Sequence, residues 1–220
     1  MNELEYEIYA LSAENKDSFQ RFFRQRRFEI ILSELRKVAK KGDKILDIGC
    51  GSGIGTMQLS ELGFDMTGSD INKKFVNYAI TESKKRGLKT RFFLSDLTKN
   101  LQKFNNKFDV IIASEVLEHV EDYRTAIENL KKYLKMDGYL IVTVPNFHGL
   151  AGITEFLWSL KARYNWVHEH KHYICSPRRM DIILRNSGLT LLRIYTAFYI
   201  SHFLPFVSKR LSSFFFEKEQ

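Results

Sequence analysis

A short apolar run that leads into three glycines at alternate positions constrains this chain more than any other segment. The run occupies 44–48, and the glycines are Gly49, Gly51 and Gly53. An apolar run of this length that ends in glycine is typical of a buried strand. The glycines let the backbone turn tightly and approach a ligand, and free N–H groups at the start of a following helix can face an anionic group. The segment therefore predicts a strand, a ligand-binding turn and a helix in succession.

Segments typical of strands alternate with segments typical of helices along most of the chain. The expected strands are 44–48, 64–68, 90–94, 108–113, 138–144 and 189–195, and the expected helices are 17–40, 55–62, 72–86, 120–134 and 177–186. Such alternation indicates βαβ units around a parallel sheet. We therefore expect an α/β fold, doubly wound and Rossmann-like, whose mostly parallel sheet has helices on both faces. Ligands bind such sheets outside the carboxyl ends of the strands.

Length and composition fit one domain. The 220 residues are 44% hydrophobic, which suffices for a full core, so we expect a single domain over 1–220. Within it we distinguish an N-terminal helical segment at 1–43, an insertion at 147–170 that would cap the substrate, and an aromatic tail at 198–220. Neither a signal peptide nor a transmembrane run is evident, which predicts a cytoplasmic protein. Two cysteines are too few for a disulfide scaffold.

The glycine pattern separates this turn from two other phosphate-binding turns. The dinucleotide fingerprint requires glycines at the first, third and sixth positions. Counted from Gly49 the sixth residue is Ile54, and counted from Gly51 it is Thr56. The P-loop also fails, because no Gly-Lys-Ser/Thr follows. The turn therefore fits neither the dinucleotide fingerprint nor the P-loop.

Carboxylates follow the second and third expected strands. Asp70 ends the second strand, where a carboxylate can accept hydrogen bonds from both hydroxyls of a ribose. Asp70 could equally cap the helix that starts at Asn72, and both roles are compatible. Asp96 follows the third strand, and capping of the next turn is its alternative role. We expect both acids to lie at the ligand-binding edge.

From 44 to 192 the chain resembles the class I S-adenosylmethionine-dependent methyltransferases, through the segment Asp47-Ile-Gly-Cys-Gly-Ser-Gly and the two acids. The resemblance implies that the glycine turn holds the methionine end of the cofactor and that Asp47 orients its amino group. It also implies that Asp70 binds the ribose, and that Asp96 binds the adenine amino group while its neighbour packs on the ring. The implied cofactor-binding residues are Asp47, Gly49, Cys50, Gly51, Gly53, Asp70, Ile71, Asp96, Leu97 and Ser114.

The segment after the fourth strand limits the types of methyl transfer that are expected. It lacks the Asn/Asp-Pro-Pro-aromatic pattern of amino-group methyltransferases, and it lacks a cysteine for attack on cytosine. Its Glu115-x-x-Glu118-His119 pattern resembles ubiquinone-type O-methyltransferases. Similar segments in small-RNA 2′-O-methyltransferases bind a divalent metal. Glu115 and Glu118, three residues apart, could share a helical face beside His119, and such ligands suit Mg²⁺.

A methyl transfer to a hydroxyl requires a base, and histidine is the usual one near pH 7. The catalytic candidates are His119, His170 and Glu118, and His168 and His172 flank the second of these. Three interpretations are open: a metal-free histidine base, a Mg²⁺ site of Glu115, Glu118 and His119, or loop histidines without a catalytic role.

The acceptor is expected to be a small or lipid-like molecule methylated on oxygen. The alternatives are metal-dependent RNA 2′-O-methylation and a non-catalytic cofactor-binding subunit. The net charge of +8 would favour RNA, but the lack of a recognisable RNA-binding appendage counts against nucleic acid. On the N-terminal helix, Arg26 or Arg27 could face the cofactor carboxylate.

The aromatic tail at 198–220 has three possible roles. It could be an interfacial helix in peripheral contact with a membrane, a dimer contact, or a cover for the edge of the sheet. A seventh strand is not evident in it. The sequence leaves the oligomeric state open.

Overall fold

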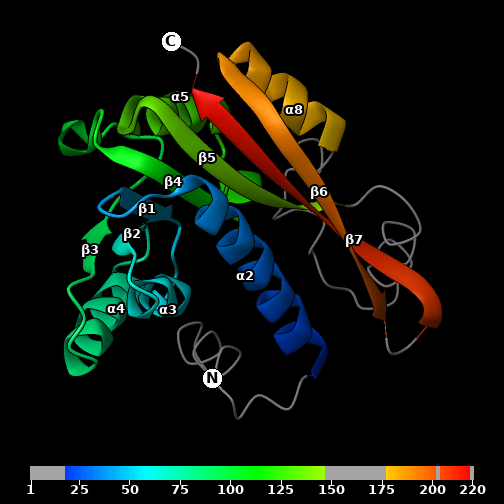
Figure 1. Cartoon of the computed structure of the whole chain (residues 1–220), viewed down its shortest axis with the longest axis horizontal. Helices are drawn as coiled ribbons and strands as arrows, with labels where there is room; N and C mark the ends of the chain where they lie inside the picture. The colour runs from blue at the N-terminus through cyan, green and yellow to red at the C-terminus, as the bar shows by residue number, and fades with distance from the viewer. Residues whose placement is uncertain (1–17, 147–176, 202–203, 219–220) are drawn as a thin grey trace.

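In the computed structural model, which describes residues 18–146, 177–201 and 204–218, the core is a seven-stranded sheet with strand order β3-β2-β1-β4-β5-β7-β6 (Figure 1). The strands are β1 Lys44–Ile48, β2 Asp65–Asp70, β3 Arg91–Leu94, β4 Phe108–Ser114, β5 Leu134–Asn146, β6 Leu189–Ser201 and β7 Leu204–Lys218. β1 to β5 pair in parallel, and β7 is antiparallel to both of its neighbours. The strand order reverses between β1 and β4, which is where such sheets bind ligands.

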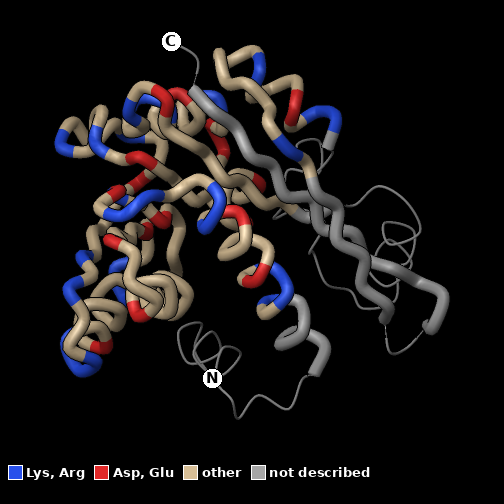
Figure 2. Tube along the Cα trace, viewed as in Figure 1, with Lys and Arg blue, Asp and Glu red and all other residues tan. Residues whose placement is uncertain are grey.

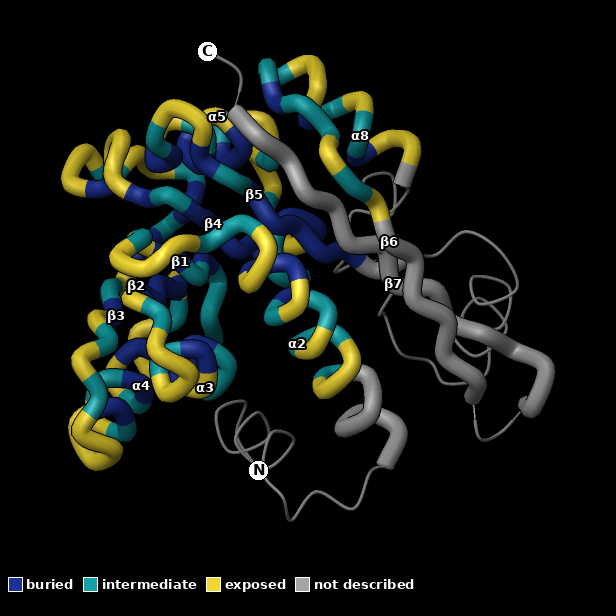
Figure 3. The backbone as a smooth tube through the Cα atoms, in the orientation of Figure 1, coloured by how far each residue is buried: buried dark blue, intermediate teal, exposed yellow. Residues whose placement is uncertain are grey.

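Helices cover both faces of the sheet because successive residues of each strand point to opposite sides. On one face, buried residues of α5 (Tyr123–Tyr133) and α8 (Pro177–Asn186) belong to the same core cluster as Leu46 and Ile48 of β1, and α8 lies against β6 and β7. On the other face, α2 (Ser18–Val38) and α3 (Ile54–Glu61) pack around Ile45. α4 (Lys73–Lys85) joins this second layer next to α3. The central strands are accordingly the most buried part of the molecule (Figure 3).

The expected architecture is confirmed for the described residues, and most element bounds agree within a few residues. The segments 44–48 and 177–186 form the expected strand and helix without any shift. α5 starts later than expected because a 3₁₀ turn, Leu117–His119, precedes it and the Asp122 side chain accepts the Thr125 N–H at 3.1 Å. A second 3₁₀ turn, Gln102–Phe104, lies between β3 and β4.

The tail contradicts the helical interpretation. Residues 204–218 form β7, which lies between β5 and β6 and pairs with both. An interfacial helix, one of the three roles considered for the tail, is therefore wrong for residues 204–218, and a seventh strand is present. The sequence interpretation missed it because the partners of β7 in β5 lie more than 60 residues away along the chain, and local spacing carries no information about them.

The N-terminal helix α2 is tied to the far edge of the sheet by a buried carboxylate. Glu34 is only 2% exposed, and its Oε2 accepts the Arg193 Nε–H of β6 at 2.8 Å. Lys37, one turn further along α2, pairs with the other oxygen of Glu34. The two cations hold the pKa of Glu34 below its usual range against the opposing effect of burial.

Basic side chains are spread over α2, α4, α5 and α8, as expected for solvated helix faces (Figure 2). Among the described residues, no helix has both the length and the apolar character needed to cross a membrane.

Candidate active site at the carboxyl ends of the strands

The turn after β1 has the backbone conformation that its glycines allow. Gly49, Gly51 and Gly53 all have positive φ angles, of 66°, 54° and 74°. A Cβ added at Gly49 would lie 2.3 Å from Cγ2 of Val116, and one at Gly53 would lie 2.6 Å from Cε1 of Phe92. Both positions therefore require glycine for space as well as for conformation. The turn is pressed against the residues that follow β4 on one side and against β3 on the other.

Asp70 joins this turn to the end of β2. Its Oδ2 accepts the Gly51 N–H at 2.8 Å, and its Oδ1 accepts the Asn72 N–H at 2.7 Å. The expected helix cap at this point is formed by Asn72, whose side chain accepts the Lys74 N–H. Each carboxylate oxygen of Asp70 has a second lone pair, so two acceptors remain for a ligand. Two backbone donors thus position Asp70 and leave both of its carboxylate oxygens able to accept a further hydrogen bond.

Asp47 lies beneath the same turn, at the end of β1. Its Oδ2 accepts the Thr56 hydroxyl at 2.5 Å, which connects β1 to α3. Burial raises the pKa of Asp47 to about 6, and the nearby charge of Asp70 acts in the same direction, while the Thr56 hydroxyl opposes both. Because ionisation of this carboxylate is unfavourable in the free protein, a cationic group that binds beside it would stabilise the ionised form.

Asp96 follows β3 and caps a short turn. Its Oδ1 accepts both the N–H and the hydroxyl of Thr98, at 2.9 and 2.6 Å, and these bonds hold its pKa below the usual range. The next residue, Leu97, is buried, whereas Ile71 after β2 is 69% exposed. The Ser95 N–H donates to the Asp70 carbonyl at 2.8 Å, so the ends of β2 and β3 are joined directly.

A chain of polar contacts runs across the carboxyl ends of β4 and β5 to the N-terminal helix. The Ser114 and Thr143 hydroxyls are 2.9 Å apart, and the Thr143 hydroxyl donates to Glu115 Oε1 at 3.2 Å. Because Thr143 has only one hydroxyl proton, the Ser114 hydroxyl is the donor in the first contact. Arg27 Nη1 of α2 lies 3.2 Å from Glu115 Oε2. Glu115 also has φ 55°, an uncommon conformation for a residue other than glycine.

The expected grouping of Glu115, Glu118 and His119 on one helical face is wrong. Glu115 follows the last residue of β4, and the 3₁₀ turn comprises only Leu117–His119. With three residues per turn, neighbours point about 120° apart, so Glu118 is fully buried while His119 is exposed. No group of three or more His, Cys, Asp or Glu side chains within the described ranges has the geometry to hold a metal ion.

Glu118 is an unusual buried acid. Neither of its carboxyl oxygens has a hydrogen-bond partner among the described residues. Burial raises the pKa of Glu118 well above its usual range, and the charge of Glu115 acts in the same direction.

The remaining catalytic candidates lie outside the described residues. These are His168, His170 and His172, together with the whole 147–170 insertion. Arg26, the alternative to Arg27, pairs with Glu29 on its own helix at 3.0 Å.

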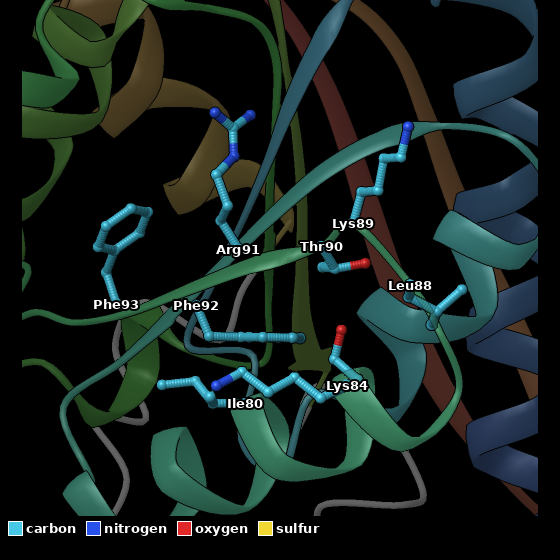
Figure 4. Close-up of a pocket in the computed structure, with 9 residues that line it drawn as sticks. Ile80, Lys84, Leu88, Lys89, Thr90, Arg91, Phe92 and Phe93 are labelled. Atoms are coloured by element: carbon cyan, nitrogen blue, oxygen red, sulfur yellow. The ribbon is translucent and has the colours of Figure 1, made fainter.

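A separate hollow of about 310 Å³ lies at the opposite end of β3. It is lined by residues 88–93 and by Ile80, Ser83 and Lys84 of α4. Figure 4 shows Ile80, Lys84 and Phe92 side by side next to the strand. Since Asp96 follows the carboxyl end of β3 and this hollow adjoins its amino end, the hollow is not part of the candidate site.

Three residues that contact the candidate site residues were not recognised from the sequence. Thr56 positions Asp47, Thr143 links Ser114 to Glu115, and Phe92 supports two glycines, because a Cβ at Gly68 would also lie 2.5 Å from its ring. A threonine within the apolar strand Leu140–Val144 was the signal for Thr143, because a buried hydroxyl requires a partner. Thr56 and Phe92 gave no comparable signal.

Comparison with protein families gives one match over most of the chain. Residues 19–194 match the family described as a methyltransferase domain. This range contains the glycine turn, both strand-end acids and the segment after β4.

The similar curated proteins include several named ubiquinone biosynthesis O-methyltransferase. The protein from Rickettsia canadensis is 29% identical over 176 residues, which cover 78% of this chain and 72% of that protein. The one from Pelagibacter ubique is 35% identical over 106 residues, which cover 48% of this chain and 43% of that protein. The chain thus spans less than half of the second relative and nearly three quarters of the first.

Solved structures share the fold at low identity. A magnesium protoporphyrin IX methyltransferase from Synechocystis with bound S-adenosylhomocysteine has a TM-score of 0.76 at 19% identity, covering 98% of this chain and 94% of that one. A cyclase has a TM-score of 0.69, also at 19% identity, covering 88% of this chain and 80% of that one. The fold alone therefore does not determine the reaction.

Proposed function

Because the chain belongs to the methyltransferase domain family and is an S-adenosylmethionine-dependent methyltransferase, we propose that it methylates an oxygen atom of a small-molecule or lipid-like acceptor. The observation that carries the proposal is the contact of Asp70 with the Gly51 N–H, which unites two ligand-binding turns at one edge of the sheet.

The residues at this edge fit the cofactor. The positive φ angles of Gly49, Gly51 and Gly53 bring bare backbone to the position where the methionine end would lie. The two free lone pairs of Asp70 match the two ribose hydroxyls. Asp47 would receive the amino group, and Asp96, Leu97 and Ile71 would hold the adenine. Ser114 would border the cofactor at the end of β4.

When bound, the cofactor supplies a methyl group already activated by a sulfonium. The protein therefore has two tasks: to align the acceptor oxygen with the methyl carbon, and to take the proton of the acceptor. His119 is exposed at the edge where β4 ends, so it can reach a bound acceptor. We propose His119 or His170 as the base, while the buried Glu118 would shape the pocket wall.

A small acceptor agrees with the O-methyltransferase names of the relatives. The segment after β4 has no Pro-Pro-aromatic pattern for a planar amino group, which also favours oxygen. A hydroxylated aromatic compound that carries an apolar chain would offer both an oxygen atom for methylation and a lipid-like body.

The first experiment measures binding of S-adenosylmethionine and S-adenosylhomocysteine by calorimetry. Asp70→Ala should weaken both at least about tenfold, because two charge-assisted hydrogen bonds are lost. Asp65→Ala is the matched control, since Asp65 lies at the other end of β2 and forms an exposed ion pair with Arg91. Equal affinities for wild type and Asp70→Ala would contradict the proposed site.

Acceptors are then screened by transfer of labelled methyl groups to phenols with and without an apolar chain, with short RNAs and amines in parallel arms. O-methylated phenols identified by mass spectrometry would support the proposal. Turnover on RNA alone, with a steep dependence on salt, would replace it with the nucleic-acid alternative.

A further inference from the structure

We propose that the guanidinium of Arg27, rather than a divalent cation, is the counter-charge of the Glu115-x-x-Glu118 segment, and that this contact positions α2 over the transfer site. Arg27 is then a positioning residue. The inference rests on the proposed function only for the location of the transfer site.

The first step of the argument is the set of partners around Glu115. Its Oε2 lies 3.2 Å from Arg27 Nη1, and its Oε1 accepts the Thr143 hydroxyl at 3.2 Å. Its own N–H donates to the Thr143 carbonyl at 3.0 Å. The N–H and both carboxylate oxygens of Glu115 therefore have partners. One of these partners is the guanidinium of Arg27, a cation that the chain itself supplies.

The second step is the direction of the neighbouring side chains. Glu118 is fully buried close enough to Glu115 for their charges to interact, whereas His119 is exposed, so the three side chains do not converge on one point. A divalent cation with oxygen ligands needs several ligands around a single position. The 3₁₀ turn does not provide this arrangement among the described residues.

The third step is the position of Arg27 in the fold. Arg27 lies on α2, about two turns before Glu34, and Glu34 fastens the same helix to β6 through Arg193. The helix is thus attached at two points, one at the edge of the sheet and one at the carboxyl end of β4. Loss of the Arg27 contact would release the half of α2 that adjoins the site.

The inference has a direct test with the full chain, so that histidines outside the described residues are also present. Free Mn²⁺ is followed by electron paramagnetic resonance during titration with wild type, Arg27→Met, Arg27→Lys and Arg26→Met. Wild type and Arg26→Met should leave the free Mn²⁺ signal unchanged. Arg27→Met, which leaves two acids without their cation, should gain Mn²⁺ affinity, and Arg27→Lys should restore the wild-type behaviour.

Thermal unfolding provides a second readout. Arg27→Met should lower the Tm by about 2–4 °C, and the effect should disappear when Glu115→Gln is already present, because the two groups act as a pair. Arg26→Met is the matched control, since Arg26 forms an exposed ion pair with Glu29 on the same helix.

Stoichiometric Mn²⁺ binding by wild type that is lost in Glu115→Gln would overturn the proposal. Additive effects of Arg27→Met and Glu115→Gln on the Tm would also overturn it. Neither readout depends on a methyl acceptor, so failure of the proposed function and failure of this inference are distinguishable.

Discussion

At the scale of single residues, Asp47 is an acid whose ionised form is unfavourable in the free protein. Its carboxylate is half-buried beneath the glycine turn, beside the charge of Asp70, and it accepts the Thr56 hydroxyl. In the free protein, ionisation of this carboxylate therefore costs free energy. A ligand ammonium at this point would remove that cost, which makes binding and ionisation favour each other.

This arrangement predicts a pH-dependent stability with a definite sign. The pKa of Asp47 is raised from 3.8 to about 6, so between these values the folded chain holds a proton that the unfolded chain has lost. The free energy of unfolding therefore falls as pH rises from about 4 to 6, by up to about 3 kcal/mol from this group. Asp47→Asn should remove this fall, and its Tm advantage over wild type should grow across that window. If the Tm values of wild type and Asp47→Asn, both measured without ligand, changed in parallel between about pH 4 and 6, the raised pKa of Asp47 would be contradicted.

The residue scale also shows where the sequence was informative. The glycines and strand-end acids were recognisable because each demands a particular backbone or partner. The Glu115-to-His119 arrangement was not, because it depends on whether the chain continues β4 or starts a helix. A single left-handed residue, Glu115, and one 3₁₀ turn rotated His119 away from Glu118.

At the scale of elements, α2 is held by charge as well as by packing. Ile31 and Leu35 bury the helix against the sheet, and Glu34 lies between them with Arg193 as its partner from β6. A buried carboxylate that loses its cation is costly.

Arg193→Met should therefore destabilise the protein by about 2 kcal/mol and lower the Tm by about 4–8 °C. The value is moderate because Arg193 is itself 36% exposed and Lys37 still faces Glu34. Compared with wild type, Arg193→Met should accelerate hydrogen exchange at the amides of α2 more than at the amides of β1. The control is Arg185→Met, which breaks an exposed pair with Asp181 within α8 and should change the Tm little. Equal losses in both variants would contradict a special role for Glu34.

At the scale of the whole molecule, β7 completes the sheet. It pairs with β5 through residues 210–217 and with β6 along most of its length. β6 has no other partner strand in the described sheet. The parallel part, β3 to β5, could be derived from local periodicity, whereas the insertion of β7 between two strands could not, because strand pairing over long separations is decided by the assembled sheet.

A chain truncated after Ser201 should therefore lose cooperative unfolding, because β6 would have no partner and one edge of β5 would be open. A chain that lacks only residues 219–220 is the control and should melt like wild type. Circular dichroism and size-exclusion chromatography distinguish the two. A truncated chain that unfolds cooperatively at the wild-type temperature would show that β7 is dispensable.

The position of β7 also dictates an order of events during synthesis. β6 leaves the ribosome before β7, yet it cannot join the sheet without β7, because β7 lies between β6 and β5. During that interval β5 presents an open edge to other nascent chains. Pairing of β7 with β5 thus closes a strand edge that could otherwise promote aggregation during synthesis, and slower translation of the segment between β5 and β7 would prolong its exposure.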